Sequence, residues 1–378
     1  MTQPNLPGGA GPTNLQLTGG AAIVAPVSAF PGGVPGNALV VLPLSKPSDE
    51  LTDAMKKGPV ALDVEDMWKL LGFNGPAVQV QDAEGRPIAI GLEDLLSGLE
   101  KHWQENKDDL NRGRLLAQEL MKYSRFERAE KVLSKVVAGG GSGEDWLGLG
   151  VAQMQQEKWD KAELTLKGAQ NLMADNPYPS LHLAKVLKGK DDKQAEREAI
   201  ERAIHIDSSC VDAWAYLFSQ VRENETEEAA MKVVTTLADT ETHKRSAAPY
   251  VALQGFYSGE ESTRAKALEL AQKAVERNDG DVLALISLSA LHGQSGDLDK
   301  VIGLLQRHEA KMVNDVRLAN NYFEALFQAR QLDKVTKLLN ALAGSSNKEV
   351  KQFAIERSRA VAQYLQQQQQ QLAGAARK

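Results

Sequence analysis

Apolar residues recur with helical spacing from about residue 108 to the end of the chain. Within each segment they return every three or four positions, so one face of the segment is apolar and the other is polar. Turn-forming residues separate most of the successive segments. The pattern predicts a long region, residues 108–378, built from amphipathic helices that pack in succession.

A different pattern precedes this region. Apolar and polar residues alternate over 78–81, a turn sequence follows at 82–85, and a second apolar run at 88–90 supplies the partner strand of a hairpin. Because an isolated hairpin is only marginally stable in water, these strands are expected to pack on helices. The next helix is predicted by an apolar face made of Leu92, Leu95, Leu96, Leu99 and Trp103.

Two further helices are predicted upstream of the hairpin. Ser48 and Asp49 can cap a short helix that ends before Gly58, and Asp63 can cap another that reaches Leu71. Together with the hairpin, these helices predict a small α/β module over residues 48–107.

The first 47 residues form a proline- and glycine-rich arm. None of the first 45 is charged, and 7 proline and 8 glycine residues lie among them, so a packed core of their own is not expected. Two interpretations stay open, a flexible tail or an arm that docks in extended form on its own body or on a neighbouring copy. The residues that would dock are Ile23, Val24, Val27, Phe30, Leu39, Val40, Val41 and Leu42.

Docking of this arm requires backbone hydrogen bonds. Burying an apolar side chain contributes about 1.5–3 kcal/mol, whereas fixing one residue of backbone costs about 1–2 kcal/mol, and over the arm these nearly cancel. A free edge of the predicted hairpin can supply the missing hydrogen bonds by strand addition. We therefore expect the docked arm to extend that hairpin, within one copy or across two.

The helical region contains an internal repeat. Similar turn sequences precede Ala129 and Ala162, which are 33 residues apart, and Val301 and Val335, which are 34 apart. The positions that open successive units are separated by 34, 37, 34 and 34 residues, and the three extra residues can lie in a loop at 242–246. These opening positions are Ser180, Trp214, Val251, Leu285 and Ala319.

The residue types at these positions resemble the tetratricopeptide repeat (TPR). Trp146, Leu149, Gly150 and Ala162 resemble the family's tryptophan, its leucine-glycine pair and the small residue that opens the second helix. The resemblance implies an all-α solenoid, a right-handed superhelix of about seven helix-turn-helix units over 108–346. A capping helix with a glutamine-rich tail is expected over 347–378. In such arrays small residues let helices approach closely, and large ones such as Trp214 fill the space between units.

Composition limits the possible partners. The net charge of −6 argues against a general nucleic-acid partner, because phosphate binding requires a basic surface. No apolar run is long enough for a membrane helix. The single cysteine, Cys210, excludes an internal disulfide and fits a reducing compartment, so a cytoplasmic location is expected. Cys210 itself is interpreted as a buried structural thiol.

No motif predicts catalysis. The six histidines never stand at metal-ligand spacing beside an acid. The glycine run at 139–143 lacks the Gly-Lys-Ser/Thr ending of a phosphate loop and follows a helix instead of a strand. The sequence therefore predicts neither metal nor cofactor, and a protein that is not an enzyme. The 48–107 module has no nucleophile, metal or nucleotide motif, so a catalytic role for this module with a regulatory solenoid is not expected.

The resemblance also implies a binding surface, since the first helix of each TPR unit lines a concave groove. Positions where some TPR proteins hold a chaperone's C-terminal carboxylate read Arg114, Gln118, Gly148, Tyr178 and His182 here, which does not match that pattern. The predicted groove residues are Leu147, Val151, Met154, Tyr178, His182, Lys185, Tyr216, Ser219, Arg222, Leu253, Phe256, Ile286, Asn320, Asn321, Glu324 and Phe327.

These features lead to two functional hypotheses. The first is an adaptor or scaffold that binds a peptide or a folded protein partner in the groove. The alternative is a self-assembling structural protein, a homo-oligomer in which the N-terminal arm docks on a neighbouring copy. The mass of the oligomer at several concentrations, with and without residues 1–45, distinguishes them.

Overall fold

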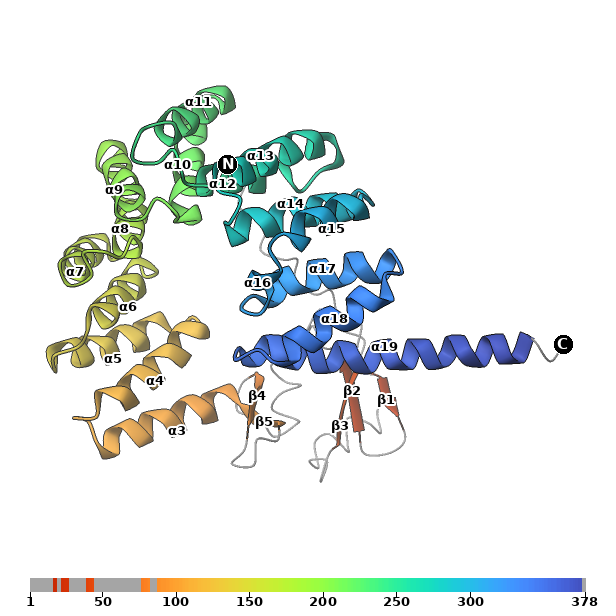
Figure 1. The fold of residues 1–378 in the computed structure, drawn as a ribbon. Coiled ribbons are helices and arrows are strands. Elements are labelled where there is room, and N and C mark those ends of the chain that lie inside the picture. The colour runs from red at the N-terminus through yellow and green to blue at the C-terminus, as the bar shows by residue number, and fades with distance from the viewer. Residues whose placement is uncertain (1–15, 19–21, 27–38, 44–75, 82–86, 376–378) are drawn as a thin grey trace. The chain divides into compact units, whose positions relative to one another are not determined.

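Seventeen α-helices follow five short strands along the part of the chain that this computed structural model describes, residues 16–18, 22–26, 39–43, 76–81 and 87–375 (Figure 1). The chain divides into two units, Met1–Gln156 and Glu157–Lys378. The helix pairs follow one another in the predicted order, which confirms the all-α, TPR-like fold. The helices predicted before Gly58 and at 63–71, and the arm residues Val27 and Phe30, lie outside the described residues.

The strands of the first unit form two separate sheets. In the arm, β1 (Gln16–Thr18), β2 (Ala22–Pro26) and β3 (Leu39–Pro43) form an antiparallel sheet in the order β1-β2-β3. The two apolar clusters of the arm are therefore extended, with Ile23 opposite Leu42. Within one copy, the described strands of the arm do not add to the hairpin, because β2 and β3 pair with each other in a separate sheet. Strand addition across two copies stays a prediction.

The predicted hairpin is present as β4 (Ala77–Gln81) and β5 (Pro87–Gly91), and it packs on helices as expected. The chain continues directly into α3 (Leu92–Glu105), whose first amide donates to the carbonyl of Pro76 at 2.9 Å. Val78, Leu96 and Trp103 are at most 3% exposed and belong to one apolar core with Leu116 of the next helix. The hairpin and α3 thus share their core with the first helix pair.

Three further helices complete the first unit. Glu93 on α3 joins this helix to the next pair, since it accepts hydrogen bonds from Arg125 at 3.1 Å and from Arg128 at 2.9 Å. The helices are α4 (Leu110–Lys122), α5 (Phe126–Ala138) and α6 (Gly143–Met154).

The second unit is helical throughout its described residues. Its first helices are α7 (Trp159–Leu172), α8 (Tyr178–Gly189), α9 (Lys193–Ile206), α10 (Val211–Asn224), α11 (Glu227–Ala238), α12 (Ala248–Tyr257), the 3-10 turn η2 (Glu261–Thr263) and α13 (Arg264–Arg277). They are followed by α14 (Val282–Gln294), α15 (Leu298–Gln306), α16 (Glu309–Met312), α17 (Val316–Gln328), α18 (Leu332–Ala343) and α19 (Lys348–Ala375).

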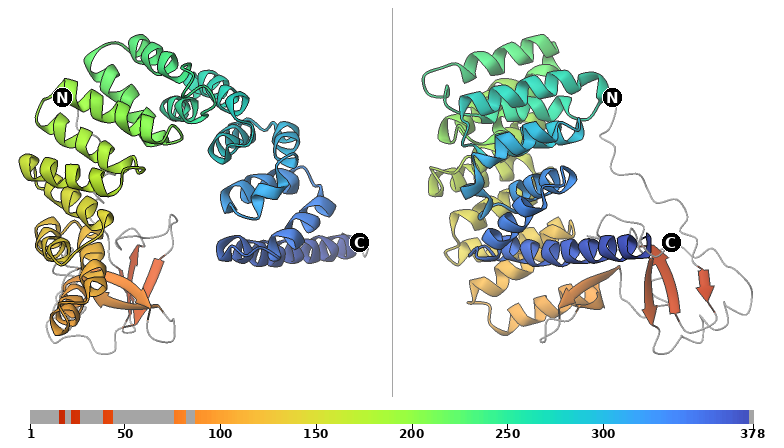
Figure 2. Two further views of the ribbon diagram at one scale, coloured as in Figure 1. Left: turned by 60° about the vertical axis from the view of Figure 1, so that its left-hand side comes forward. Right: turned by 45° about the vertical axis from the view of Figure 1, so that its right-hand side comes forward.

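Consecutive helices of the second unit pack as pairs, and the pairs stack on one another (Figure 2). The first helices of successive pairs also meet, since α10 contacts α12, α12 contacts α14, and α14 contacts α17. In contrast, α8 and α10 are not among the closely packed helices. The first-helix face is therefore more open between α8 and α10 than farther along the array.

The turn inside a helix pair has a repeating backbone conformation. Ser124, Glu157, Asp191 and Arg330 adopt φ values of 57° to 58°, and Gly296 adopts 76°. These left-handed residues follow one another at 33 or 34 positions wherever neighbouring pairs share the turn, which reproduces the predicted period. Glycine adopts this conformation at little cost, whereas the other four residues are strained by their Cβ atoms.

Trp214 fills the interior as the repeat pattern predicts. Its side chain is fully buried on α10, and its ring nitrogen donates to the carbonyl of Ser208 at 2.9 Å. The ring of His243 meets it edge-on, with the centroids 5.5 Å apart. His243 lies between α11 and α12, where the sequence placed the three extra residues. That insertion therefore packs on the core.

The closing helix α19 ends the array. Val350 and Ala354 are fully buried, whereas the run 366–370 is exposed, as predicted for a solvated helix end. Figure 1 shows the C-terminal part of α19 extending beyond the helices on which its first half packs. The first part of this long helix thus covers the last pair, and residues 366–370 face solvent.

Candidate functional site

The strongest candidate site is a trough on the first-helix face of the second unit, between α8 and α10. It encloses a pocket of about 480 Å³. Five of the predicted groove residues line it: Tyr178, His182, Lys185, Tyr216 and Ser219. The structure adds Asp212, Leu181 and Ala215 to this set, which we call the α8–α10 trough.

Helical spacing explains why these side chains converge. On α8, positions 178, 182 and 185 follow the i, i+4, i+7 rule, and positions 212, 216 and 219 repeat it on α10. Each helix therefore presents a stripe of three polar or aromatic side chains to the other. Sequence reasoning missed Asp212, although extending the stripe of Tyr216 and Ser219 by one turn would have found it.

His182 is the most perturbed titratable group of the trough. Its ring is largely buried, and Nδ1 has no hydrogen-bond partner among the described residues. Burial, together with the positive charge of Lys185, lowers the pKa of His182 to about 4. The imidazole is therefore neutral near pH 7, and its Nδ1 atom can form one hydrogen bond with a ligand.

Tyr216 forms the opposite wall beside a buried carboxyl group. Glu196 on α9 is 3% exposed, and burial raises its pKa. Burial first, and the nearby charge of Glu196 second, also raise the pKa of Tyr216. The Tyr216 hydroxyl and Oε1 of Glu196 nevertheless lack a hydrogen bond of ordinary geometry within the described part of the chain. The Tyr216 hydroxyl is thus buried beside the carboxyl group of Glu196.

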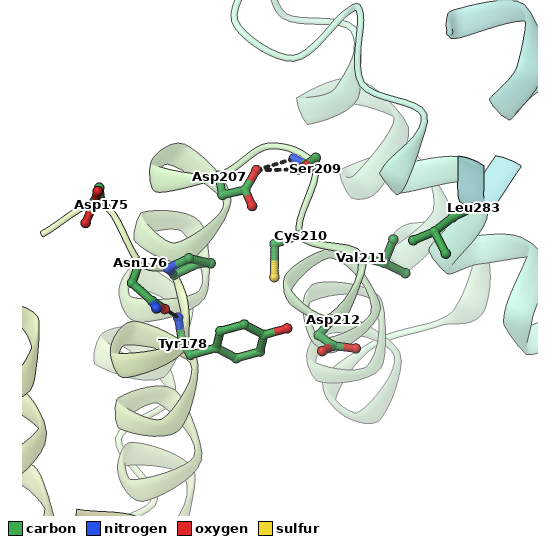
Figure 3. A pocket seen from close by; sticks show the side chains of 10 residues that line it. Asp175, Asn176, Tyr178, Asp207, Ser209, Cys210, Val211, Asp212 and Leu283 are labelled. Atoms are coloured by element: carbon green, nitrogen blue, oxygen red, sulfur yellow. Dashed lines mark hydrogen bonds between the residues drawn. The ribbon is translucent and has the colours of Figure 1, made fainter. Parts of the chain in front are cut away.

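A second pocket of about 450 Å³ adjoins the trough and shares Tyr178 and Asp212 with it (Figure 3). We call it the acidic socket, because Asp175 and Asp207 join Asp212 in its wall. Asp207 is fixed by its own turn, since its carboxylate accepts from the amide of Ser209 at 2.8 Å and from its hydroxyl at 2.6 Å.

Cys210 also faces the acidic socket (Figure 3) and is 7% exposed, which confirms the prediction of a buried thiol. Burial raises the pKa of this thiol, and the charges of Asp212 and Asp207 raise it further. The thiol is therefore a poor nucleophile.

Two of the predicted groove residues are buried instead. Leu253 is fully buried, because α12 packs against α10, α13 and α14 and this residue lies on the packed side. Met154 is 9% exposed and lies at the end of α6. Neither side chain is available to a partner. Leu147 and Val151 of α6 and Ile286 of α14 are half-buried.

Arg222 and Phe256 are joined to each other. The Arg222 guanidinium lies 5.2 Å from the ring centre of Phe256 and 5.5 Å from that of Phe218. The two rings are 4.7 Å apart. This cluster links α10 to α12 and continues the first-helix face beyond the trough.

The predicted residues of α17 have partners inside the chain. Arg357 on α19 donates to Oδ1 of Asn320 at 3.1 Å and pairs with Glu324 at 3.3 Å. Phe327 meets Tyr364 of α19, with ring centroids 5.2 Å apart. Asn321 donates to the hydroxyl of Ser289 on α14 at 2.9 Å. At this end of the array, the predicted groove residues therefore serve the packing of α14, α17 and α19.

Arg114, one of the positions compared with chaperone-binding TPR proteins, is also engaged. Its Nε and Nη2 donate to the carboxylate of Asp145 at 2.9 and 2.8 Å. Burial raises the pKa of Asp145, but hydrogen bonds from Arg114 and Ser142 outweigh it, so the pKa is lowered. Arg114 therefore joins α4 to α6 through this ion pair.

Within the described residues, no cluster of three or more His, Cys, Asp or Glu side chains has the geometry to bind a metal ion. None of the described helices combines the length and hydropathy that crossing a membrane requires.

Comparisons with known proteins give matches by structure alone. No family model and no curated protein matches the sequence. MamA 41-end from Desulfovibrio magneticus RS-1 is 15% identical, covering 39% of this chain and 84% of its own, with a TM-score of 0.35. Yeast Tom70 is 13% identical over 73% of this chain and 59% of its own, with a TM-score of 0.39. YrrB, described as a TPR protein with an unusual peptide-binding site, is 20% identical over 50% of this chain and 95% of its own, with a TM-score of 0.31.

Proposed function

We propose that this protein is a non-catalytic scaffold that binds an extended segment of a partner protein in the α8–α10 trough. One observation carries the proposal. Matched polar stripes on α8 and α10 line a pocket, and in one of its walls Nδ1 of His182 is buried without a hydrogen-bond partner among the described residues. The partner is identified by chemistry alone, as a polypeptide that can hydrogen-bond to both walls.

The energetics favour a polypeptide ligand. A buried polar group without a partner costs about 1–3 kcal/mol, and this free energy is recovered when a ligand supplies the hydrogen bond. An extended backbone offers donors and acceptors at about 3.3 Å per residue, so one segment can reach both walls of the trough. A purely apolar ligand would leave Nδ1 of His182 unsatisfied.

The chemistry of the site supports binding more than catalysis. His182 is neutral near pH 7 because its pKa is lowered to about 4, which makes it a weak general base. The raised pKa of Cys210 keeps that thiol protonated.

A library of random 12-residue peptides displayed on phage tests the proposal with the full chain as bait. We expect selected peptides to bind the native protein and to lose at least about tenfold in affinity to the Ser219→Trp variant, whose indole fills the trough. The matched control is Ser262→Trp, which places the same side chain on exposed η2.

Both variants should unfold at the temperature of the native protein. If no peptide is enriched, or if the enriched peptides bind Ser219→Trp as well as the native chain, the proposed function is wrong.

Self-assembly through the arm remains the second candidate. β2 is flanked by β1 and β3 of its own chain, so among the described strands of this sheet an edge for strand pairing is left at β1 and at β3. The mass of the full chain and of a chain lacking residues 1–45, measured at several concentrations, decides this case. A mass that doubles only when the arm is present would support it.

A further inference from the structure

The acidic socket indicates what kind of side chain the partner segment carries. Its wall contains three carboxylates, from Asp175, Asp207 and Asp212, and no basic residue is among those that line it. Among the described residues none of the three is joined to a lysine or arginine in an ion pair. The socket is therefore negatively charged and lacks an internal counterion.

The helix ends around the socket reduce this charge without cancelling it. α8, α10 and α14 begin at Tyr178, Val211 and Val282, next to the socket residues. Each N-terminus contributes about half a positive charge, which is less in total than the charge of three carboxylates. Consistent with a negative surrounding, the pKa of Tyr178 is raised by burial first, and the charges of Asp212 and Asp207 are among the further causes.

The rest of the socket suits a long cationic side chain with an apolar stem. Tyr178 is 44% exposed, so part of its ring is free to contact a ligand, and Figure 3 shows the ring pointing toward α10 near Asp212. Leu283, 37% exposed, lies on the other side with Val211. Aromatic faces attract cations, and methylene groups pack on apolar side chains.

From this arrangement we infer that the acidic socket binds an arginine side chain of the partner segment whose backbone lies in the α8–α10 trough. The inference rests on the proposed function, and the two pockets share Tyr178 and Asp212, so one ligand can fill both. A guanidinium stacks flat on a tyrosine ring and bridges carboxylate oxygens in two directions, whereas the lysine ammonium is a compact charge. Arginine therefore fits this wall better than lysine.

The experiment starts from the peptides selected under the proposed function. We expect arginine to be enriched at one position of the selected sequences. In the best peptide, changing that arginine to the neutral isostere citrulline should weaken binding at least about tenfold, and changing it to lysine should weaken it less. Raising the salt concentration should weaken the arginine peptide more than the citrulline peptide.

Protein variants locate the effect. The double variant Asp175→Asn/Asp212→Asn replaces two exposed carboxylates of the socket by neutral amides. In this variant the ratio of the affinities for the arginine and citrulline peptides should fall to about twofold or less. The matched control Asp299→Asn/Asp333→Asn changes two exposed aspartates on α15 and α18 and should keep the full preference.

The outcomes separate the two proposals. If peptides bind in the trough without enrichment of arginine, or if citrulline binds as well as arginine, the socket inference is wrong and the trough remains. If the double variant keeps the full preference, the arginine binds elsewhere and the inference is also wrong. If no peptide is selected, both proposals are wrong.

Discussion

The indole ring of Trp159 on α7 lies directly against Gly189 at the end of α8. A Cβ atom on Gly189 would approach three ring carbons of Trp159 to 2.8 Å, closer than real side chains come. The two helices can pack at this distance because position 189 has no side chain. We expect Gly189→Ala to destabilise the protein by about 1–3 kcal/mol, the usual cost of overpacking a well-filled site, as measured by chemical denaturation.

The control for this substitution is Gly255→Ala on α12. A Cβ atom there meets nothing within 4 Å, and alanine favours the helix more than glycine does. Gly255→Ala should therefore be neutral or stabilise the protein by up to about 1 kcal/mol. Equal effects of the two substitutions would show that the Trp159 contact does not limit position 189.

The left-handed turns give a second prediction. Arg330 is exposed and adopts φ of 58°, so Arg330→Gly should relieve strain and stabilise the protein by about 1 kcal/mol. The reverse change, Gly296→Ala at φ of 76°, should cost a similar amount, although a Cβ there has open space. A shift of the denaturation midpoint in the same direction for both variants would contradict this explanation.

The buried carboxylate of Asp145 gives a third prediction. Asp145 pairs with Arg114 and also accepts from the backbone amide of Ser142 at 2.7 Å, which completes a capping box at the start of α6. Asp145→Ala should cost about 2–4 kcal/mol, because it removes the cap and leaves Arg114 without its partner. The exposed helical pair of Glu269 and Lys273 is the control, and Glu269→Ala should cost at most about 0.5 kcal/mol. Similar costs for the two would refute the role of burial.

The repeat itself was predictable from the sequence because local signals encode it. Turn residues recur at 33 or 34 positions, and residues such as Trp214 recur where one helix pair meets the next. These signals gave the order of the helix pairs and the closing helix α19. Each of these signals lies within a single helix or turn, and periodicity is informative over that short range of sequence.

The side-chain partners across helices were not predictable in the same way. Periodicity identifies the apolar face of α12 but not how many neighbours bury it, so it predicts Leu253 as a groove residue although the side chain is fully buried. Arg357 binds Asn320 from 37 positions away, and Asp145 binds Arg114 from 31 positions away. Those pairings depend on the angle and distance between helices, which one sequence does not specify.

The convergence of the trough residues on one face was more predictable than the placement of the other predicted groove residues. Its residues stand at i, i+4 and i+7 on two helices, so a one-dimensional pattern places them on one face. The acidic socket was missed, because Asp175 and Asp207 lie in turns, where no helical period connects them to Asp212.

The last prediction concerns pH. The pKa of His182 is lowered to about 4 in the folded protein, against about 6.5 in the unfolded chain, because the buried ring resists protonation. Below pH 6.5 the unfolded state therefore binds more protons, and the contribution of His182 to stability is lost as the pH falls from about 6.5 to 4. Burial also lowers the pKa of His243 and His292, which adds to the loss.

We expect the free energy of unfolding to decrease between pH 7 and pH 5, with His182 responsible for about 1–3 kcal/mol of the change. His182→Gln, which cannot titrate, should flatten the curve of unfolding free energy against pH over this interval. Ser219→Ala, a change without titration in the same trough, should leave the slope of that curve unchanged. Parallel curves for the native protein and His182→Gln would mean that His182 is protonated as readily in the folded state as in the unfolded one, and the trough would then be more hydrated than its burial indicates.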